Sequence, residues 1–263
     1  MTDMALGAAK PETRIGSLLR GTGAAIVSTL RLGGRTWMAA PGIVAIAMLP
    51  EFAQHAAEIH LGMFDSRAAF NAAAEDPLRW FFAYPKVAGL LIGILATARF
   101  LALGSVREAL LIRPGNLLRL LFAMVLTFAA EAPFRWAGEA SSSAVLDAVL
   151  MAVSAIVQAG LTVYVVGALI GDPENGLRRA FTERWPTSVL LTLLAAIVFV
   201  PTQALHMGNH LAAMGQPQPI VWALMIFDTL VVGLMAALLG AALFVAYRAG
   251  PTWRGWTERP RRG

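Results

Sequence analysis

The segment 51-EFAQHAAEIH-60 places two carboxylates and two imidazoles within ten residues. On a helix, Glu51, His55 and Glu58 share one face, because spacings of four and three residues bring side chains together. Imidazole nitrogens and carboxylate oxygens form the mixed ligand set that suits zinc, iron or copper. The segment therefore predicts either part of a metal- or haem-binding site or the polar end of an apolar helix.

A second histidine pair, His206 and His210, lies four residues apart and would also share a helix face. In both segments a proline stands five positions before the first histidine, Pro50 before His55 and Pro201 before His206. If the two helices are neighbours, one mixed site results. The competing interpretation makes each proline the first residue of a new helix or a kink, with the polar side chains at an interface with water.

Asp228 is a third candidate, because it lies inside the long apolar segment 220–247. A carboxylate in hydrocarbon costs about 2.5–3.5 kcal/mol at the centre of a helix. Asp228 must therefore be protonated, paired or in a wet cavity. One hypothesis is a proton- or cation-coupled transport site with Glu131 and Gln158 as neighbours. The other is a buried polar clamp, for instance to Arg135 or a threonine hydroxyl.

The composition predicts that membrane-spanning helices position these residues. Of 263 residues, 57% are hydrophobic and 14% are charged, with a mean hydropathy of +0.64. Soluble domains carry about 25% charged residues, so lipid is the expected solvent. Six segments reach the roughly 20 residues that a membrane-spanning helix needs: about 37–57, 80–104, 117–136, 145–170, 188–207 and 220–247. The fold class is predicted to be all-α, a polytopic six-helix transmembrane bundle.

The rest of the chain divides around this membrane domain, 36–247. Residues 1–35 are expected to form a tail and an amphipathic helix on the membrane surface, and residues 248–263 a basic tail. With the N-terminus cytoplasmic, seventeen of the 21 lysines and arginines fall on the cytoplasmic side. The positive-inside rule then predicts a multi-pass protein of a bacterial inner membrane with both termini cytoplasmic. The basic residues follow topology rather than forming a patch for nucleic acid.

The loop 172–185 is expected to form a short interfacial helix. Its three arginines, Arg178, Arg179 and Arg184, suit anionic lipid headgroups, so membrane lipids are the predicted partners. The stretch 176-GLRRAFTERWPTSVLLTLL-194, with a basic amphipathic helix before the first span, resembles the YciC-like bacterial membrane proteins. It is also similar to the membrane domain fused to some glycerophosphodiester phosphodiesterases. The resemblance implies six spans and transfers no catalytic residues.

The sequence has no Walker A, GxGxxG, HExxH or GxSxG motif and no cysteine, so an enzyme is not expected. The leading hypothesis is a non-enzymatic integral membrane protein without a cofactor. It would organise or sense lipid, or assist a membrane complex, with a membrane-protein partner or a second copy of itself. The alternatives are a small transporter that uses Asp228 and an outer-face metal- or haem-binding component that uses His55 and His206. The distance between these two histidines distinguishes the last alternative from the others.

Overall fold

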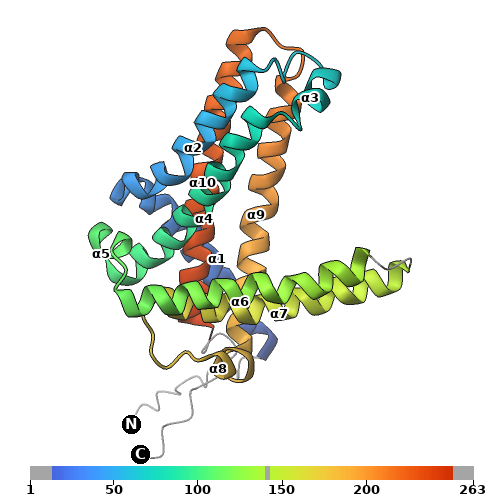
Figure 1. Cartoon of the computed structure of the whole chain (residues 1–263). Helices are drawn as coiled ribbons and strands as arrows, with labels where there is room; N and C mark the ends of the chain where they lie inside the picture. Colours follow the sequence, from blue (N-terminus) through green and yellow to red (C-terminus); the bar gives the residue numbers. More distant parts are fainter. Residues whose placement is uncertain (1–13, 140–142, 251–263) are drawn as a thin grey trace, which may run out of the picture.

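The computed structural model describes residues 14–139 and 143–250, and these residues are almost entirely helical (Figure 1). The elements in this part of the chain are α1 (Arg14–Ala39), α2 (Pro41–His60), α3 (Arg67–Ala73), α4 (Pro77–Leu103), α5 (Val106–Leu110), α6 (Pro114–Glu139), α7 (Ala144–Ile170), α8 (Leu177–Thr182), α9 (Trp185–Ala213) and α10 (Gln218–Ala249). The predicted all-α polytopic bundle is confirmed. The expected N-terminal tail up to residue 13 and the basic tail beyond residue 250 lie outside the described residues.

The six predicted spans correspond to α2, α4, α6, α7, α9 and α10. Among the described residues, the last five of these are long and apolar enough to cross a membrane on their own. Helix α2 qualifies only together with α1, from which it is bent by 89°. Short helices α3 and α5 were not predicted, whereas α8 forms within the loop that was expected to be helical.

Helices α2, α4, α9 and α10 run along one direction, and α10 contacts each of the other three (Figure 1). Glycines permit this close approach. A Cβ atom on Gly89 of α4 would lie 2.6 Å from the Ile46 carbonyl oxygen of α2, and one on Gly93 would lie 3.2 Å from Ala47 Cβ. The Gly89–Gly93 pair thus forms a packing seam between α4 and α2.

A second GxxxG pair, Gly167 and Gly171, lies at the end of α7. Gly167 contacts the side chain of Asn175, in the loop that follows α7. Gly171 ends α7 with a positive φ of 78°, and a Cβ atom there would lie 2.6 Å from the Asn116 side chain of α6. Glycine is favoured at such a helix end because it adopts the left-handed conformation without a steric penalty.

The predicted amphipathic helix forms as α1, but its small-residue face packs on protein. Ala25, Thr29, Gly33 and Thr36 are buried along one side, while Arg31 is exposed. Gly33 is so close to α10 that a Cβ atom there would lie 2.6 Å from the Leu238 side chain. One side of α1 therefore packs against α10 of the bundle, while the opposite side is exposed.

Helices α6 and α7 pack against each other as a hairpin that runs across the direction of α2, α4, α9 and α10 (Figure 1). Arg99 of α4 attaches one end of this hairpin to α4 and α5. It donates hydrogen bonds to the carbonyl oxygen of Leu169, in α7, and to that of Glu108, in α5. Arg119 of α6 donates to the carbonyl oxygen of Asp172, just after α7, and so joins the two halves of the hairpin at the same end. Apolar side chains of α7 also pack there in one core with residues of α9 and α10.

Candidate metal centre

The carboxylates and histidines of α2 lie on the last three turns of one continuous helix. Pro50 lies inside α2, and Pro201 lies inside α9. The interpretation of either proline as the first residue of a new helix is therefore wrong. Each proline removes one backbone hydrogen bond, but the helix continues because the residues on both sides of it remain packed against neighbouring helices.

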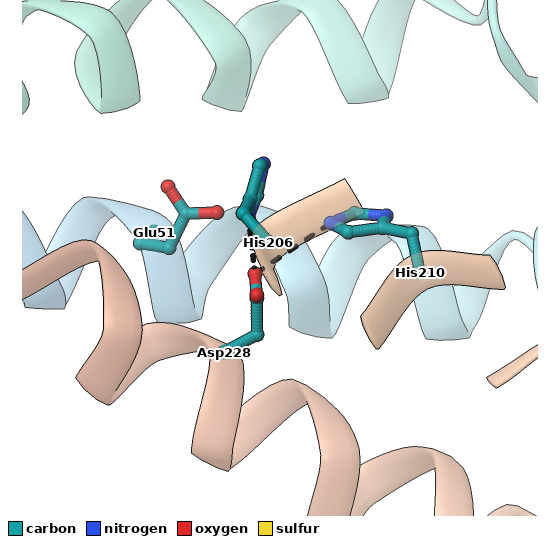
Figure 2. A group of neighbouring side chains, drawn as sticks. All are labelled: Glu51, His206, His210 and Asp228. Carbon is teal, nitrogen blue, oxygen red and sulfur yellow. Dashed lines mark hydrogen bonds and ion pairs between the residues drawn. The ribbon is translucent and has the colours of Figure 1, made fainter. Parts of the chain in front are cut away.

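The histidines of α2 and α9 meet at Asp228 of α10. His55 Nε2 lies 3.0 Å and His206 Nδ1 lies 2.6 Å from the same oxygen, Asp228 Oδ2. His210 Nε2 lies 3.6 Å from this oxygen, and Asn209 Nδ2 donates to Asp228 Oδ1 at 2.9 Å. Figure 2 shows the side chains of α9 turned toward the Asp228 carboxylate. His55 and His206 therefore lie within ligand distance of a common point, as the metal hypothesis requires.

Two further carboxylates surround His55. Its Nδ1 atom lies 3.1 Å from Glu58 Oε2, and its Nε2 atom lies 3.1 Å from Glu51 Oε1. Because both ring nitrogens face carboxylate oxygens, the imidazole satisfies all of these contacts only when both nitrogens carry hydrogen. Gln54 also donates to Glu58 Oε1, at 2.7 Å.

Helix α4 supplies two cations to the edge of the cluster. Arg79 Nε lies 3.2 Å from Glu58 Oε1, and Lys86 Nζ lies 2.8 Å from Glu51 Oε1. Both cations are partly exposed, whereas the carboxylates that they contact are fully buried. Long basic side chains can reach the surface in this way while their stems lie along apolar helices.

The cluster is closed off from solvent by apolar side chains. Asp228 and the three α2 residues Glu51, His55 and Glu58 each have 0% exposed surface. Buried Met63 and Phe64, which follow α2, form a small core with residues of α9 and α10 at the end of the bundle where α3 lies (Figure 1). The Phe64 ring lies 5.7 Å from the His210 ring. The polar groups therefore interact in a low-dielectric environment.

Four buried side chains each offer one ligand atom within 4.8 Å of the others: Glu51, His206, His210 and Asp228. An ion at the usual distances of about 2.0–2.2 Å to nitrogen and oxygen holds its ligand atoms within about 4.4 Å of one another, so small side-chain movements close this set around an ion. Glu51 Oε2 makes no hydrogen bond or ion pair with a described residue, and His210 Nε2 has only its 3.6 Å contact with Asp228 Oδ2. These buried acceptors are what a cation would satisfy.

The charges of the cluster limit it to one divalent ion. Without an ion, the three carboxylates are balanced by Arg79, Lys86 and a doubly protonated His55. With an ion, Glu51 and Asp228, two neutral imidazoles and the doubly charged ion form a neutral set, and charge balance then requires His55 to be neutral as well. Glu58 is balanced by Arg79, and Lys86 lies at the partly exposed edge. A second group, His55, Glu58 and His210, also has ligand spacing but shares His210 with the first. A second ion there would leave positive charge uncompensated in a buried site.

The structure merges two hypotheses that the sequence kept apart. All five predicted metal candidates, Glu51, His55, Glu58, His206 and His210, join the transport candidate Asp228 in one cluster. The fourth histidine, His60, is exposed and lies outside it.

The other two transport candidates lie elsewhere, so their prediction as neighbours of Asp228 is wrong. Gln158 Nε2 donates to Glu131 Oε2 at 3.0 Å, and Ser154 donates to the same oxygen at 2.9 Å. These contacts join α6 to α7 within the hairpin. Asp228 is clamped by histidines and Asn209 rather than by Arg135 or a threonine. The reason is the direction of the hairpin, which runs across α10 instead of beside it (Figure 1).

Sequence reasoning missed Asn209, Gln54 and the two α4 cations as members of the cluster. Asn209 follows His206 by three residues, a spacing that places both side chains on one helix face. This signal was present in the sequence. Arg79 and Lys86 gave no comparable signal, because charges near span ends are usual in membrane proteins.

The candidate lipid-contact arginines lie near α8, away from the cluster. Arg179 pairs with Glu174 and Glu183, each at less than 3 Å, and Arg184 lies 3.2 Å from Asp172. The hydrogen bonds that Arg179 donates to the carboxylates of Glu174 and Glu183 raise its pKa above the ordinary value. Arg178 is exposed.

No protein-family model, curated protein or solved structure matches this chain. The resemblance to YciC-like proteins and to the phosphodiesterase-linked membrane domain therefore stays a prediction. The assignment of a site depends on the geometry of the chain itself.

Proposed function

We propose that this integral membrane protein binds one divalent transition-metal ion within its helical bundle, through Glu51, His206, His210 and Asp228. The observation that carries the proposal is the convergence of these four buried ligand residues from three helices within 4.8 Å. Two nitrogen and two oxygen ligands suit zinc, and also iron or copper.

A purely structural clamp explains the cluster less well. A clamp is stabilising when every buried polar atom has a partner, because an unsatisfied one costs about 1–3 kcal/mol. Glu51 Oε2 has no hydrogen bond or ion pair with a described residue, and His210 Nε2 lies beyond hydrogen-bond distance of Asp228, at 3.6 Å. A bound cation removes this cost and also offsets the burial of two carboxylates.

The arrangement favours a single ion over haem. His55 and His206 both face one carboxylate oxygen, rather than the two sides of a flat ring. Four protein ligands also fill the tetrahedral positions of zinc, whereas catalytic zinc sites keep one position for water or substrate. The ligand count therefore supports a held or carried ion and agrees with the prediction of a non-enzymatic protein.

Metal analysis of the protein purified in mild detergent tests this proposal. We expect close to one zinc, iron or copper ion per chain after removal of loosely bound metal. His206→Ala removes one ligand and should abolish retention. His60→Ala, which changes an exposed histidine on α2, is the matched control and should retain the ion. A wild-type protein that neither contains metal nor takes up zinc on addition contradicts the proposal.

Transport through the same site is a second candidate, and the interior prolines favour it. Pro50 and Pro201 each lie five residues before a histidine of the cluster, on two different helices. A proline inside a helix removes a hydrogen bond and creates a position where the helix can bend. Bending of α2 or α9 there would separate ligands that belong to different helices and release the ion.

Zinc flux into proteoliposomes tests the transport candidate. We expect flux in the wild-type protein and none in Asp228→Asn at equal protein level. If the folded wild-type protein binds zinc but shows no zinc flux, the metal-binding proposal stands and the transport candidate is wrong.

The predicted bacterial inner-membrane location, the cytoplasmic termini and the lipid-organising role also belong to this proposal. They are supported by the distribution of basic residues along the sequence.

A further inference from the structure

An apolar cavity of about 570 Å³ lies between α7 and α9, next to α8. Its lining includes Ile156, Gly160, Phe181, Trp185, Val189 and Ala196. Helix α8 and α3 lie at opposite ends of the molecule, so this cavity is separate from the candidate metal centre (Figure 1).

Small residues and one aromatic ring shape the cavity. A Cβ atom on Gly160 would lie 2.5 Å from Phe181 Cε1, so the phenylalanine of α8 fits only against glycine. Ala155, Ala159 and Ala196 leave space where larger side chains would close the angle between α7 and α9. The local sequence thus forms a narrow apolar groove with Phe181 at its α8 end.

The length of the groove matches one leaflet of a bilayer. Trp185 and Ala196, both in its lining, are eleven residues apart on α9. At the helical rise this corresponds to about 17 Å. The hydrocarbon core is about 30 Å thick, so one leaflet measures about 15 Å. Trp185 begins α9, and tryptophan prefers the headgroup layer, which places the α8 end of the groove near the membrane surface.

Hydrogen-bond donors and positive charge gather at this same end. Ser188 lines the groove, and its buried hydroxyl makes no hydrogen bond to a described residue. Arg184, the residue before Trp185, is already paired with Asp172 and lies over the Tyr247 ring, so its charge is already balanced. Arg178 is exposed on the same short helix as Phe181, and no described carboxylate forms an ion pair with it. An anionic group with several acceptor oxygens complements this set.

We propose that the groove binds one acyl chain of an anionic phospholipid, with the phosphate held at the α8 end by Arg178 and the Ser188 hydroxyl. The groove supplies apolar contact along one leaflet, and Arg178 supplies the preference for negative charge. This inference is independent of the metal centre, because it uses other helices and the opposite end of the bundle.

Native mass spectrometry of delipidated protein tests the inference, with phosphatidylglycerol and phosphatidylcholine of identical acyl chains as probes. We expect the wild-type protein to retain one phosphatidylglycerol in preference to phosphatidylcholine. Ala196→Phe fills the groove and should remove most of the retained lipid. Ala204→Phe, at an exposed position further along α9, is the matched control and should retain it. Arg178→Gln should reduce the preference for phosphatidylglycerol by about fivefold, the effect of one basic residue near an anionic surface.

Equal retention of the two lipids by the wild-type protein overturns the headgroup assignment and with it the proposal. Equal loss of lipid in Ala196→Phe and Ala204→Phe also overturns it, because the groove would then have no special part in binding. If Ala196→Phe abolishes a dimer and leaves lipid retention unchanged, the groove holds a second copy of the chain instead.

Discussion

Asp228 is the residue on which the candidate metal centre depends most directly. Its carboxylate is contacted by His55 from α2 and by His206 and Asn209 from α9. In a bilayer core an unpaired carboxylate would be costly, so these contacts explain how α10 can carry it. They also make Asp228 the point where three helices meet.

We expect Asp228→Asn to bind zinc at least about tenfold more weakly while remaining folded. The loss follows because the amide carries no charge to offset the ion. Folding should persist because the substitution leaves two carboxylates, Glu51 and Glu58, balanced by Lys86 and Arg79. Zinc titration of the detergent-purified variant and its elution profile on size exclusion measure the two effects.

Glu131→Gln is the matched control for this variant, because it also neutralises a carboxylate of an apolar helix. Glu131 is bonded to Gln158 within the hairpin, so its neutralisation should not change zinc affinity. Unchanged zinc binding by Asp228→Asn would contradict the ligand assignment. Loss of folded Asp228→Asn protein would show that the clamp is the main role of this carboxylate.

Most residues of the site could be predicted from their spacing in the sequence. That they form one cluster could not be predicted. Helical spacing placed Glu51, His55 and Glu58 on one face and paired His206 with His210. The contact between His55 and Asp228 joins residues 173 positions apart, and no local pattern reports such a distance. The sequence therefore yielded separate metal and transport hypotheses for what is one cluster.

At the scale of elements, the approach of α2 to α4 depends on Gly89. A Cβ atom there would lie 2.6 Å from the Ile46 carbonyl oxygen and 2.9 Å from Pro50 Cγ. We expect Gly89→Val to destabilise the protein by about 1–3 kcal/mol, because the backbone of α2 would have to move. Chemical unfolding in detergent measures this change.

Gly34→Val on α1 is the control for this packing prediction, since nothing lies within 4 Å of its Cβ position. It should leave stability nearly unchanged. Because Pro50 adjoins Glu51, Gly89→Val should also lower zinc retention, whereas Gly34→Val should not. Equal stability of the two variants would show that α2 and α4 can separate without cost.

The junction between α7 and α10 is expected to depend on pH through Asp172, which lies outside the spans. Burial acts to raise the pKa of this carboxyl, but a hydrogen bond from Tyr247, the Glu174 backbone N–H and the Arg184 charge outweigh it, and the pKa is lowered. Tyr247 Oη lies 2.6 Å from Asp172 Oδ2. Because the folded-state pKa is depressed, ionised Asp172 stabilises the fold above its unfolded pKa of about 3.9. This stabilisation is lost as pH falls through the folded pKa.

Tyr247→Phe should therefore lower the free energy of unfolding at pH 7 by about 1.5–3 kcal/mol, the range for hydrogen bonds to charged groups. The difference from the wild-type protein should shrink only in the acid range below about pH 4, as the pH falls through the lowered folded-state pKa of Asp172. Unfolding curves at pH 7, 5 and 3 measure this trend. Tyr84→Phe, which alters an exposed tyrosine of α4, should show no such trend. A difference that stays constant down to pH 3 would refute the role of the carboxylate.

At the scale of the whole molecule, the existence of the spans could be predicted but their directions could not. Length and hydropathy identify α4, α6, α7, α9 and α10 because lipid requires continuous apolar helices. The tilt of a helix depends on packing against its neighbours, which hydropathy does not contain. The α6–α7 hairpin is attached at one end, through the apolar core that α7 shares with α9 and α10 and through the hydrogen bond from Arg99 to Leu169. It takes a direction across the other helices (Figure 1).

Cysteine accessibility in intact cells tests both orientation and the direction of the hairpin, because the chain contains no cysteine of its own. Glu75→Cys, beside α3, should react with a membrane-impermeant maleimide from outside the cell. Pro173→Cys, beside α8, should react only after permeabilisation, since these two sites lie at opposite ends of the bundle (Figure 1). The reverse pattern would place the termini outside the cell and contradict the positive-inside assignment.

The direction of the hairpin is tested by Ala144→Cys, at the start of α7. This cysteine should stay unlabelled from outside if the hairpin runs across the bundle. Labelling of Ala144→Cys together with Glu75→Cys would instead show that the hairpin crosses the bilayer alongside the other spans, as the hydropathy alone predicts.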